Sequence, residues 1–158
     1  MPIDRDQDDQ QLVFVIRATN IVETKMKNII AAYVGPSPDR ADFVASHLLN
    51  NSIVSFAAKV KLVLAIAEAV SVKVKRNALH TLLSRRNAFA HQDHLTALRF
   101  TTDDEGIPDI SVVVESIKAS GELESVTHEK AMYEFTCAYG EVETDLAALA
   151  RAVGVREA

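Results

Sequence analysis

The sequence predicts a mainly α-helical protein, a helical bundle of about five helices with an inserted β-ribbon at about residues 95–117. Three observations predict this fold class. Apolar residues recur at steps of three or four over most of the chain, which is the period of one helix face. Gly and Pro together number nine among 158 residues, too few for an all-β protein with many tight turns. Hydrophobic residues make up 48% and charged residues 25%, so we expect one globular domain over residues 1–158.

The first half of the chain predicts three helices. A helix near 9–34 is indicated by its apolar spacing, and Gly35-Pro36 ends it because Pro cannot continue the hydrogen-bond ladder. A short second helix starts with Ser37 as cap and Pro38 in the first turn and reaches about Leu49. Asn50-Asn51-Ser52 then reads as a break, and Ser52 is a candidate cap for a third helix. The apolar stripe of that third helix consists of Phe56, Val60, Val63, Leu64 and Ala67.

The second half predicts a bend, a helix, a ribbon and a last helix. The β-branched stretch 70–74 indicates a bend or helix boundary, and a fourth helix follows at about 75–92. Residues 95–102 and 110–117 are rich in β-branched residues and flank an acidic turn, which predicts a two-stranded ribbon. From Thr127 the helical period returns, and Gly154 is expected to end it. The apolar stripe of this last predicted helix suits bundle or coiled-coil packing and consists of Met132, Phe135, Tyr139, Val142, Leu146, Leu149 and Val153.

Cysteine content and hydropathy favour a cytoplasmic protein. The single cysteine, Cys137, cannot form an internal disulfide, which favours a reducing compartment. The acidic start of the chain is not a signal-peptide pattern. Charged residues interrupt the most hydrophobic region, so we expect no membrane span and no membrane partner.

Charge is spread unevenly. The net charge of −5 argues against a generic nucleic-acid binder. Residues 59–91, however, carry seven lysines and arginines against Glu68 alone, a balance of +6, whereas residues 103–158 carry 13 acids and 4 bases, a balance of −9. The basic segment therefore permits attraction of a polyanion, although a solvated basic helix face would look the same.

The fourth helix carries the residues with the most chemistry. On a helical wheel, Arg86 falls on an apolar stripe with Leu79, Leu83 and Ala90, where an unpaired charge is costly. Asn87 and His91 are four residues apart, so the amide can fix the imidazole tautomer. His80 and Ser84 extend this polar edge, and Arg85 points away from it.

An arginine and a histidine on one arc suit cleavage of a phosphodiester. Imidazole titrates near neutral pH and can take a proton from a ribose 2′-hydroxyl or give one to the leaving 5′-oxygen. Guanidinium offers a fork of donors to the phosphate, whose charge grows in the transition state. This route needs a 2′-hydroxyl and no metal or cofactor, so it would be limited to RNA. The predicted catalytic residues are Arg86, Asn87 and His91, and the predicted RNA-binding residues are Lys73, Lys75, Arg76, His80, Ser84 and Arg85.

The segment Arg86-Asn87-Ala88-Phe89-Ala90-His91 resembles the signature of the HEPN superfamily, an Arg, then a polar residue that is often Asn, then a few residues and a His. The resemblance is loose over about 80 residues and specific at six. It implies a homodimer in which two motif helices face a shared cleft. It further implies metal-independent endoribonuclease activity, often of a toxin or defence effector silenced by an antitoxin partner, such as a nucleotidyltransferase-like protein. The ribbon is not a general feature of that superfamily, and many of its members lack activity.

Four alternatives remain open. Arg86 could form a buried ion pair with an acid such as Glu23, and His91 could cap its helix. His91, Asp93 and His94, with His80 on a neighbouring arc, could bind zinc, although no cysteine pair or HExxH accompanies them. Cys137 is expected to be an inert thiol because no histidine is near it in sequence. The strongest rival is a non-catalytic module that dimerises through the last helix and the ribbon and binds a nucleotide or a partner protein.

Overall fold

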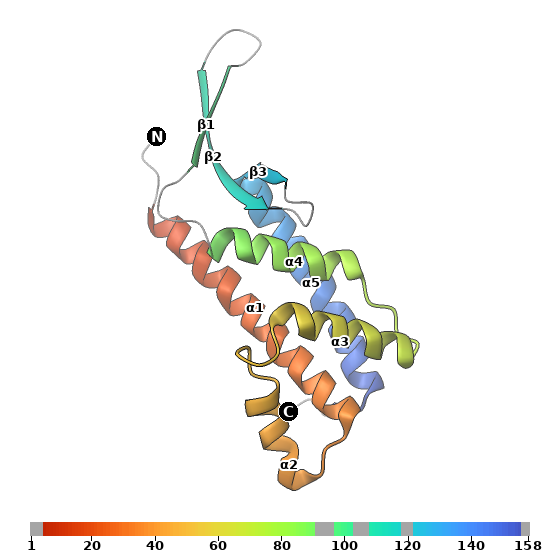
Figure 1. Ribbon diagram of the computed structural model, residues 1–158. Coiled ribbons are helices and arrows are strands. Elements are labelled where there is room, and N and C mark those ends of the chain that lie inside the picture. Colours follow the sequence, from red (N-terminus) through yellow and green to blue (C-terminus); the bar gives the residue numbers. More distant parts are fainter. Residues whose placement is uncertain (1–4, 91–96, 103–107, 118–121, 156–158) are drawn as a thin grey trace.

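The computed structural model describes residues 5–90, 97–102, 108–117 and 122–155 (Figure 1). Its elements follow the order α1 (Arg5–Val34), α2 (Pro38–Phe43), a one-turn π-helix η1 (Val44–Leu48), α3 (Phe56–Ala69) and α4 (Arg76–Ala90). The strands β1 (Ala97–Thr102), β2 (Pro108–Ile117) and β3 (Leu123–Thr127) follow, and α5 (His128–Ala152) ends the bundle. The predicted fold class, a mainly α-helical bundle with an inserted β-ribbon, is confirmed.

Helix boundaries follow the predicted stop signals. Gly35 and Gly154 have φ angles of +61° and +79° beyond the ends of α1 and α5, a conformation that glycine adopts without a Cβ clash. The bend predicted at 70–74 contains Ser71 at φ +56°. Thr127 caps α5 by accepting a hydrogen bond from the Lys130 amide at 3.3 Å.

The second helix has the predicted extent, but the predicted side-chain caps of two helices differ. It runs as α2 to Phe43 and continues as η1 to Leu48, and its cap residue Ser37 makes no side-chain cap hydrogen bond. Neither α2 nor η1 has a buried residue, whereas Val44 packs partly on the core and Leu49 is buried in it. The cap of α3 is Ser55 rather than Ser52, and its hydroxyl accepts from the Ala58 amide at 3.2 Å. The Ser52 hydroxyl and amide instead bond to the side chain of Asn50, which forms the turn before the helix.

The ribbon is part of a three-stranded antiparallel sheet of order β1-β2-β3. β2 pairs with β1 from Pro108 to Val113 and with β3 from Val113 to Ile117. β3 is absent from the prediction because its five residues are too short for a reliable alternation and run directly into α5. The inner half of the sheet packs on the bundle through Val114 and Val126, whereas the outer half extends beyond the helices (Figure 1).

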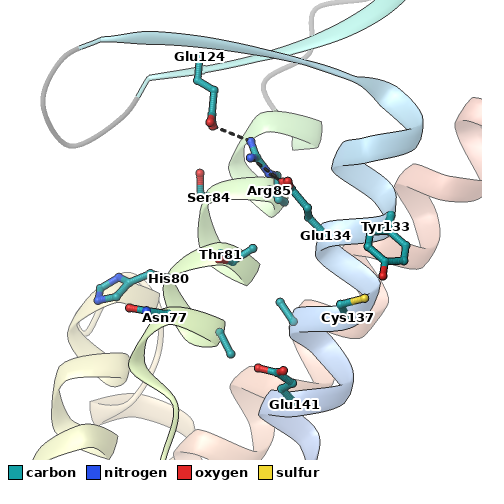
Figure 2. A pocket seen from close by; sticks show the side chains of 12 residues that line it. Asn77, His80, Thr81, Ser84, Arg85, Glu124, Tyr133, Glu134, Cys137 and Glu141 are labelled. Carbon is teal, nitrogen blue, oxygen red and sulfur yellow. Dashed lines mark hydrogen bonds and ion pairs between the residues drawn. The ribbon is translucent and has the colours of Figure 1, made fainter.

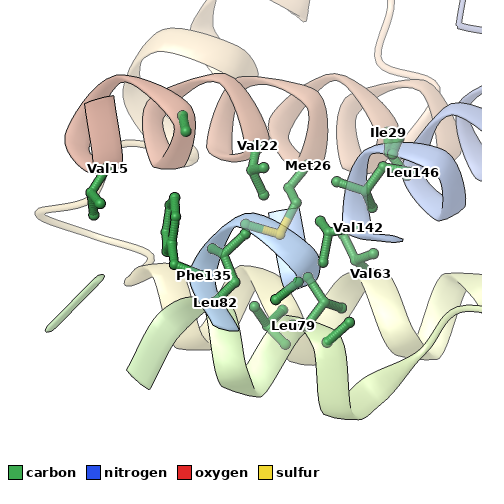
Figure 3. Close-up of a cluster of buried hydrophobic side chains, with 14 of the residues drawn as sticks. Val15, Val22, Met26, Ile29, Val63, Leu79, Leu82, Phe135, Val142 and Leu146 are labelled. Carbon is green, nitrogen blue, oxygen red and sulfur yellow. The ribbon is translucent and has the colours of Figure 1, made fainter. Parts of the chain in front are cut away.

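The core lies between α1, α3, α4 and α5 (Figure 3). Each helix contributes aliphatic side chains at helical spacing, and α5 adds Phe135. The predicted stripe of α5 is covered within the chain itself. Phe135, Val142, Leu146 and Leu149 are buried, and Met132, Tyr139 and Val153 are partly buried against the same core. The stripe therefore leaves no large excess of apolar surface for a second copy to cover.

Candidate functional site

The inward face of α4 determines where the predicted catalytic side chains lie. This face is not the predicted stripe: Leu83 and Arg86 are half-buried and Ala90 is exposed. The buried residues of α4 are Ala78, Leu79, Leu82, Arg85, Ala88 and Phe89. The core face of α4 is thus rotated from the predicted stripe toward the line through Leu82 and Phe89. The helix packs mainly against α5 and also against β2. Arg86 lies at the edge of the core, and Arg85 lies inside it.

Arg86 and Asn87 interact on the last turn of α4. The Arg86 Nη1 donates a hydrogen bond to the Asn87 Oδ1 at 3.0 Å, and both side chains are half-buried. The same turn is anchored by the buried Phe89, whose ring meets the ring of His128 edge-on with centroids 5.2 Å apart. The predicted catalytic His91 lies outside the described residues, and so does the predicted contact between His91 and Asn87.

The alternative partner for Arg86 is already engaged elsewhere. Glu23 binds the ammonium of Lys59 at 2.8 Å and the Asn51 amide at 2.8 Å. Burial raises the pKa of Glu23, but the hydrogen bonds from Lys59 and Asn51 and the nearby ammonium charges outweigh it and bring that pKa below its ordinary value. Arg86 therefore contacts an amide of its own helix turn rather than this carboxylate.

Arg85 requires a correction as an RNA-binding residue. Its side chain is 8% exposed and is held by two carboxylates. The Nε donates to Glu134 Oε2 on α5 at 2.7 Å, and the Nη1 donates to Glu124 Oε2 on β3 at 2.9 Å. The guanidinium thus joins α4, α5 and the sheet, and it has little surface to offer a phosphate. The two partners are 39 and 49 residues away in sequence, so no local pattern could predict them.

His80 and Ser84 line a groove between α4 and α5 (Figure 2). The groove has a volume of about 570 Å³, and Arg85 closes one end of it with Glu124 and Glu134. Its α5 wall contains Tyr133, Glu134, Cys137 and Glu141. Three carboxylates against one paired guanidinium make the groove acidic, which disfavours a phosphate backbone there. Arg86 and Asn87 do not line it.

The predicted basic patch is partly neutralised. Lys73, Lys75 and Arg76 are exposed near the start of α4, but the Lys75 ammonium lies 3.3 Å from Glu141 Oε1. Lys59 and Arg85 are buried in ion pairs. Arg76 and Arg86 are ten residues apart on one helix, about 15 Å along its axis. The exposed basic side chains and the Arg86–Asn87 pair therefore lie toward opposite ends of α4.

The described residues bear on the zinc alternative and on the surroundings of Cys137. No group of three or more His, Cys, Asp or Glu that could hold a metal ion occurs among them. His91, Asp93 and His94 of the zinc alternative fall outside the described ranges. Cys137 is exposed on α5, where its contact with Tyr133 raises the pKa of that phenol.

Comparisons of the chain with family models, with curated proteins and with solved structures found no match. Within the described part of the chain, no helix is both long enough and apolar enough to cross a membrane.

Proposed function

We propose that this chain is a metal-independent endoribonuclease of the HEPN type that acts as a homodimer. The observation that carries the proposal is the hydrogen bond between Arg86 and Asn87 on the last turn of α4, immediately before His91. Because the partner is a neutral amide, this contact does not offset the guanidinium charge as a carboxylate would. This bond uses one of the five guanidinium N–H groups and leaves others for a phosphate.

The residues have distinct roles in the proposed reaction. One His91 of the proposed homodimer takes the proton of a ribose 2′-hydroxyl as its oxygen attacks the adjacent phosphorus. The bond from phosphorus to the 5′-oxygen breaks, and this oxygen takes a proton from the other His91, which is protonated at the start of the step. The products are a 2′,3′-cyclic phosphate and a 5′-hydroxyl. Arg86 neutralises the charge that grows on the phosphoryl oxygens. Asn87 orients Arg86 and is a positioning residue. The exposed Lys73 and Arg76 attract the RNA backbone, and Lys75 contributes less because Glu141 pairs with it.

The test compares variants that separate these roles. Wild-type protein is incubated with single-stranded RNA in buffer containing EDTA, and cleavage rates are measured. Arg86→Ala and His91→Ala are expected to lose at least about 100-fold in rate. Arg151→Ala, at an exposed arginine of α5 that has no role in the proposed reaction, is the control and should retain cleavage within about tenfold. Equal rates for Arg86→Ala and Arg151→Ala would contradict the assignment of Arg86.

A second candidate function is a non-catalytic module that binds a partner protein. The groove between α4 and α5 favours it, because its lining contains Glu141 on α5 in addition to Glu124 and Glu134, which bind Arg85. A basic segment of a partner, such as an antitoxin, would complement this surface. This function predicts unchanged partner binding by Arg86→Ala and His91→Ala and reduced binding by Glu141→Lys. A wild-type protein that cleaves no RNA but shows this binding pattern would favour the module over the nuclease.

A further inference from the structure

The sheet has an open edge at β1. β1 pairs with β2 along its whole length, from Ala97 opposite Val113 to Thr102 opposite Pro108, and no second strand flanks it within the described residues. The ribbon of β1 and the outer half of β2 stands clear of the helices in Figure 1. Along such an edge, half of the backbone N–H and C=O groups have no strand to bond. We propose that β1 pairs antiparallel with β1 of a second copy, which joins the two sheets into one of six strands.

Other parts of the sheet are less suited to this pairing. The outer half of β2 is also open on the side away from β1, but it begins with Pro108, which has no N–H to donate. β3 runs directly into α5 through its cap Thr127, and its Glu124 is bound to Arg85 of the bundle. β1 contains no Pro and no Gly, and its residues Leu98, Phe100, Thr101 and Thr102 suit an extended chain.

Symmetry and charge select the register. Two identical antiparallel strands related by a twofold axis perpendicular to the sheet place one residue opposite its own copy. Near the middle of β1 this residue is Arg99 or Phe100. An Arg99 centre would set two like charges directly opposite each other, which destabilises a pair of strands. A Phe100 centre sets Phe100 opposite Phe100 and Leu98 opposite Thr102, so the proposed dimer is centred on Phe100.

This interface is close in sequence to the proposed catalytic residues. β1 begins seven residues after the end of α4, so the Arg86–Asn87 turn is connected to the interface strand by at most about 25 Å of extended chain. The pairing of the two β1 strands follows from the sheet alone and does not depend on the proposed nuclease activity.

Cysteine cross-linking tests the register. In a Cys137→Ser background, Phe100→Cys is expected to give a disulfide-linked dimer as the major species under mild oxidation. Leu98→Cys and Thr102→Cys, each alone, should remain unlinked, because their own copies lie about 14 Å apart in this register, beyond disulfide reach. The double variant Leu98→Cys/Thr102→Cys should link, because each cysteine faces the other type across the axis. Light scattering on the uncross-linked parent gives the oligomeric state.

Introducing a charged side chain at the twofold axis provides a second test that does not require disulfide geometry. Phe100→Lys places two ammonium groups opposite each other and should weaken the dimer at least tenfold, whereas Thr102→Lys faces Leu98 and should weaken it less. A monomeric parent at about 100 μM, or links that form at Leu98→Cys or Thr102→Cys alone, would overturn the proposal. Dimerisation is measured without RNA, so a dimer linked at Phe100→Cys that cleaves no RNA would refute the nuclease and leave the interface standing.

Discussion

The ammonium of Lys59 lies 2.8 Å from a carboxylate oxygen of Glu23, and the Lys59 side chain has no exposed surface. Asn51 joins the pair by accepting from Lys59 at 2.7 Å and donating to Glu23 at 2.8 Å. The three residues come from α3, α1 and the turn before α3, so the network fixes this turn to the bundle. A fully bonded buried ion pair is stable only as a unit, because either charge alone would be buried without its partner.

We expect Lys59→Met to lower the free energy of unfolding by about 3–5 kcal/mol, since it leaves the Glu23 carboxylate buried without its ammonium. The double variant Lys59→Met/Glu23→Leu removes both charges and should be less destabilised than the single variant. Urea unfolding followed by circular dichroism measures both. A single variant that loses under 1 kcal/mol would show that the pair contributes little.

The lowered pKa of Glu23 predicts a stability change at acid pH. Because its folded-state pKa lies below the unfolded value, the group contributes stability above the unfolded pKa near 4.5 and loses it as pH falls through the folded pKa. Glu23→Gln should therefore show a weaker loss of stability on acidification than the wild type. Thermal melts between pH 3 and pH 7 give the comparison. Parallel pH profiles for the two proteins would contradict the assignment.

The ion pairs of Arg85 predict a structural role for this residue. Arg85→Ala should lower the free energy of unfolding by about 2–3 kcal/mol, because two charge-assisted contacts that hold β3 and α5 are lost. Arg76→Ala, on the exposed first turn of the same helix, should change it by no more than about 0.5 kcal/mol. Chemical denaturation of the two variants measures the difference. Equal stability of both would mean that the Arg85 contacts do not stabilise the fold.

The caps of two helices predict unequal effects of the same substitution. Ser55 accepts a hydrogen bond from the Ala58 amide at the start of α3, whereas the Ser37 side chain makes no such bond at the start of α2. Ser55→Ala should cost about 1 kcal/mol and Ser37→Ala only a few tenths. Melting temperatures of the two variants give the order. A larger loss for Ser37→Ala would reverse it.

The sequence predicts the bundle well because helical periodicity and stop signals are local. Gly35, Gly154 and Thr127 act within a few residues of themselves, and the structure has them where the pattern predicts. The orientation of α4 could not be predicted, because it depends on two carboxylates that only the folded chain brings to Arg85. A helical wheel assigns a buried arginine to solvent unless those distant partners are known. β3 could not be predicted for a related reason. Its five residues carry too little pattern of their own, and they form a strand because they pair with β2 in the folded chain.

The measurement that tests the proposed nuclease most directly is the analysis of cleavage products from a single-stranded RNA in EDTA. The account predicts cleavage by the wild-type protein that leaves 2′,3′-cyclic phosphate and 5′-hydroxyl ends. It also predicts no cleavage of the same strand carrying a 2′-deoxy residue at the cut position. Cleavage at that deoxy position, activity that EDTA abolishes, or undiminished activity of His91→Ala would contradict it.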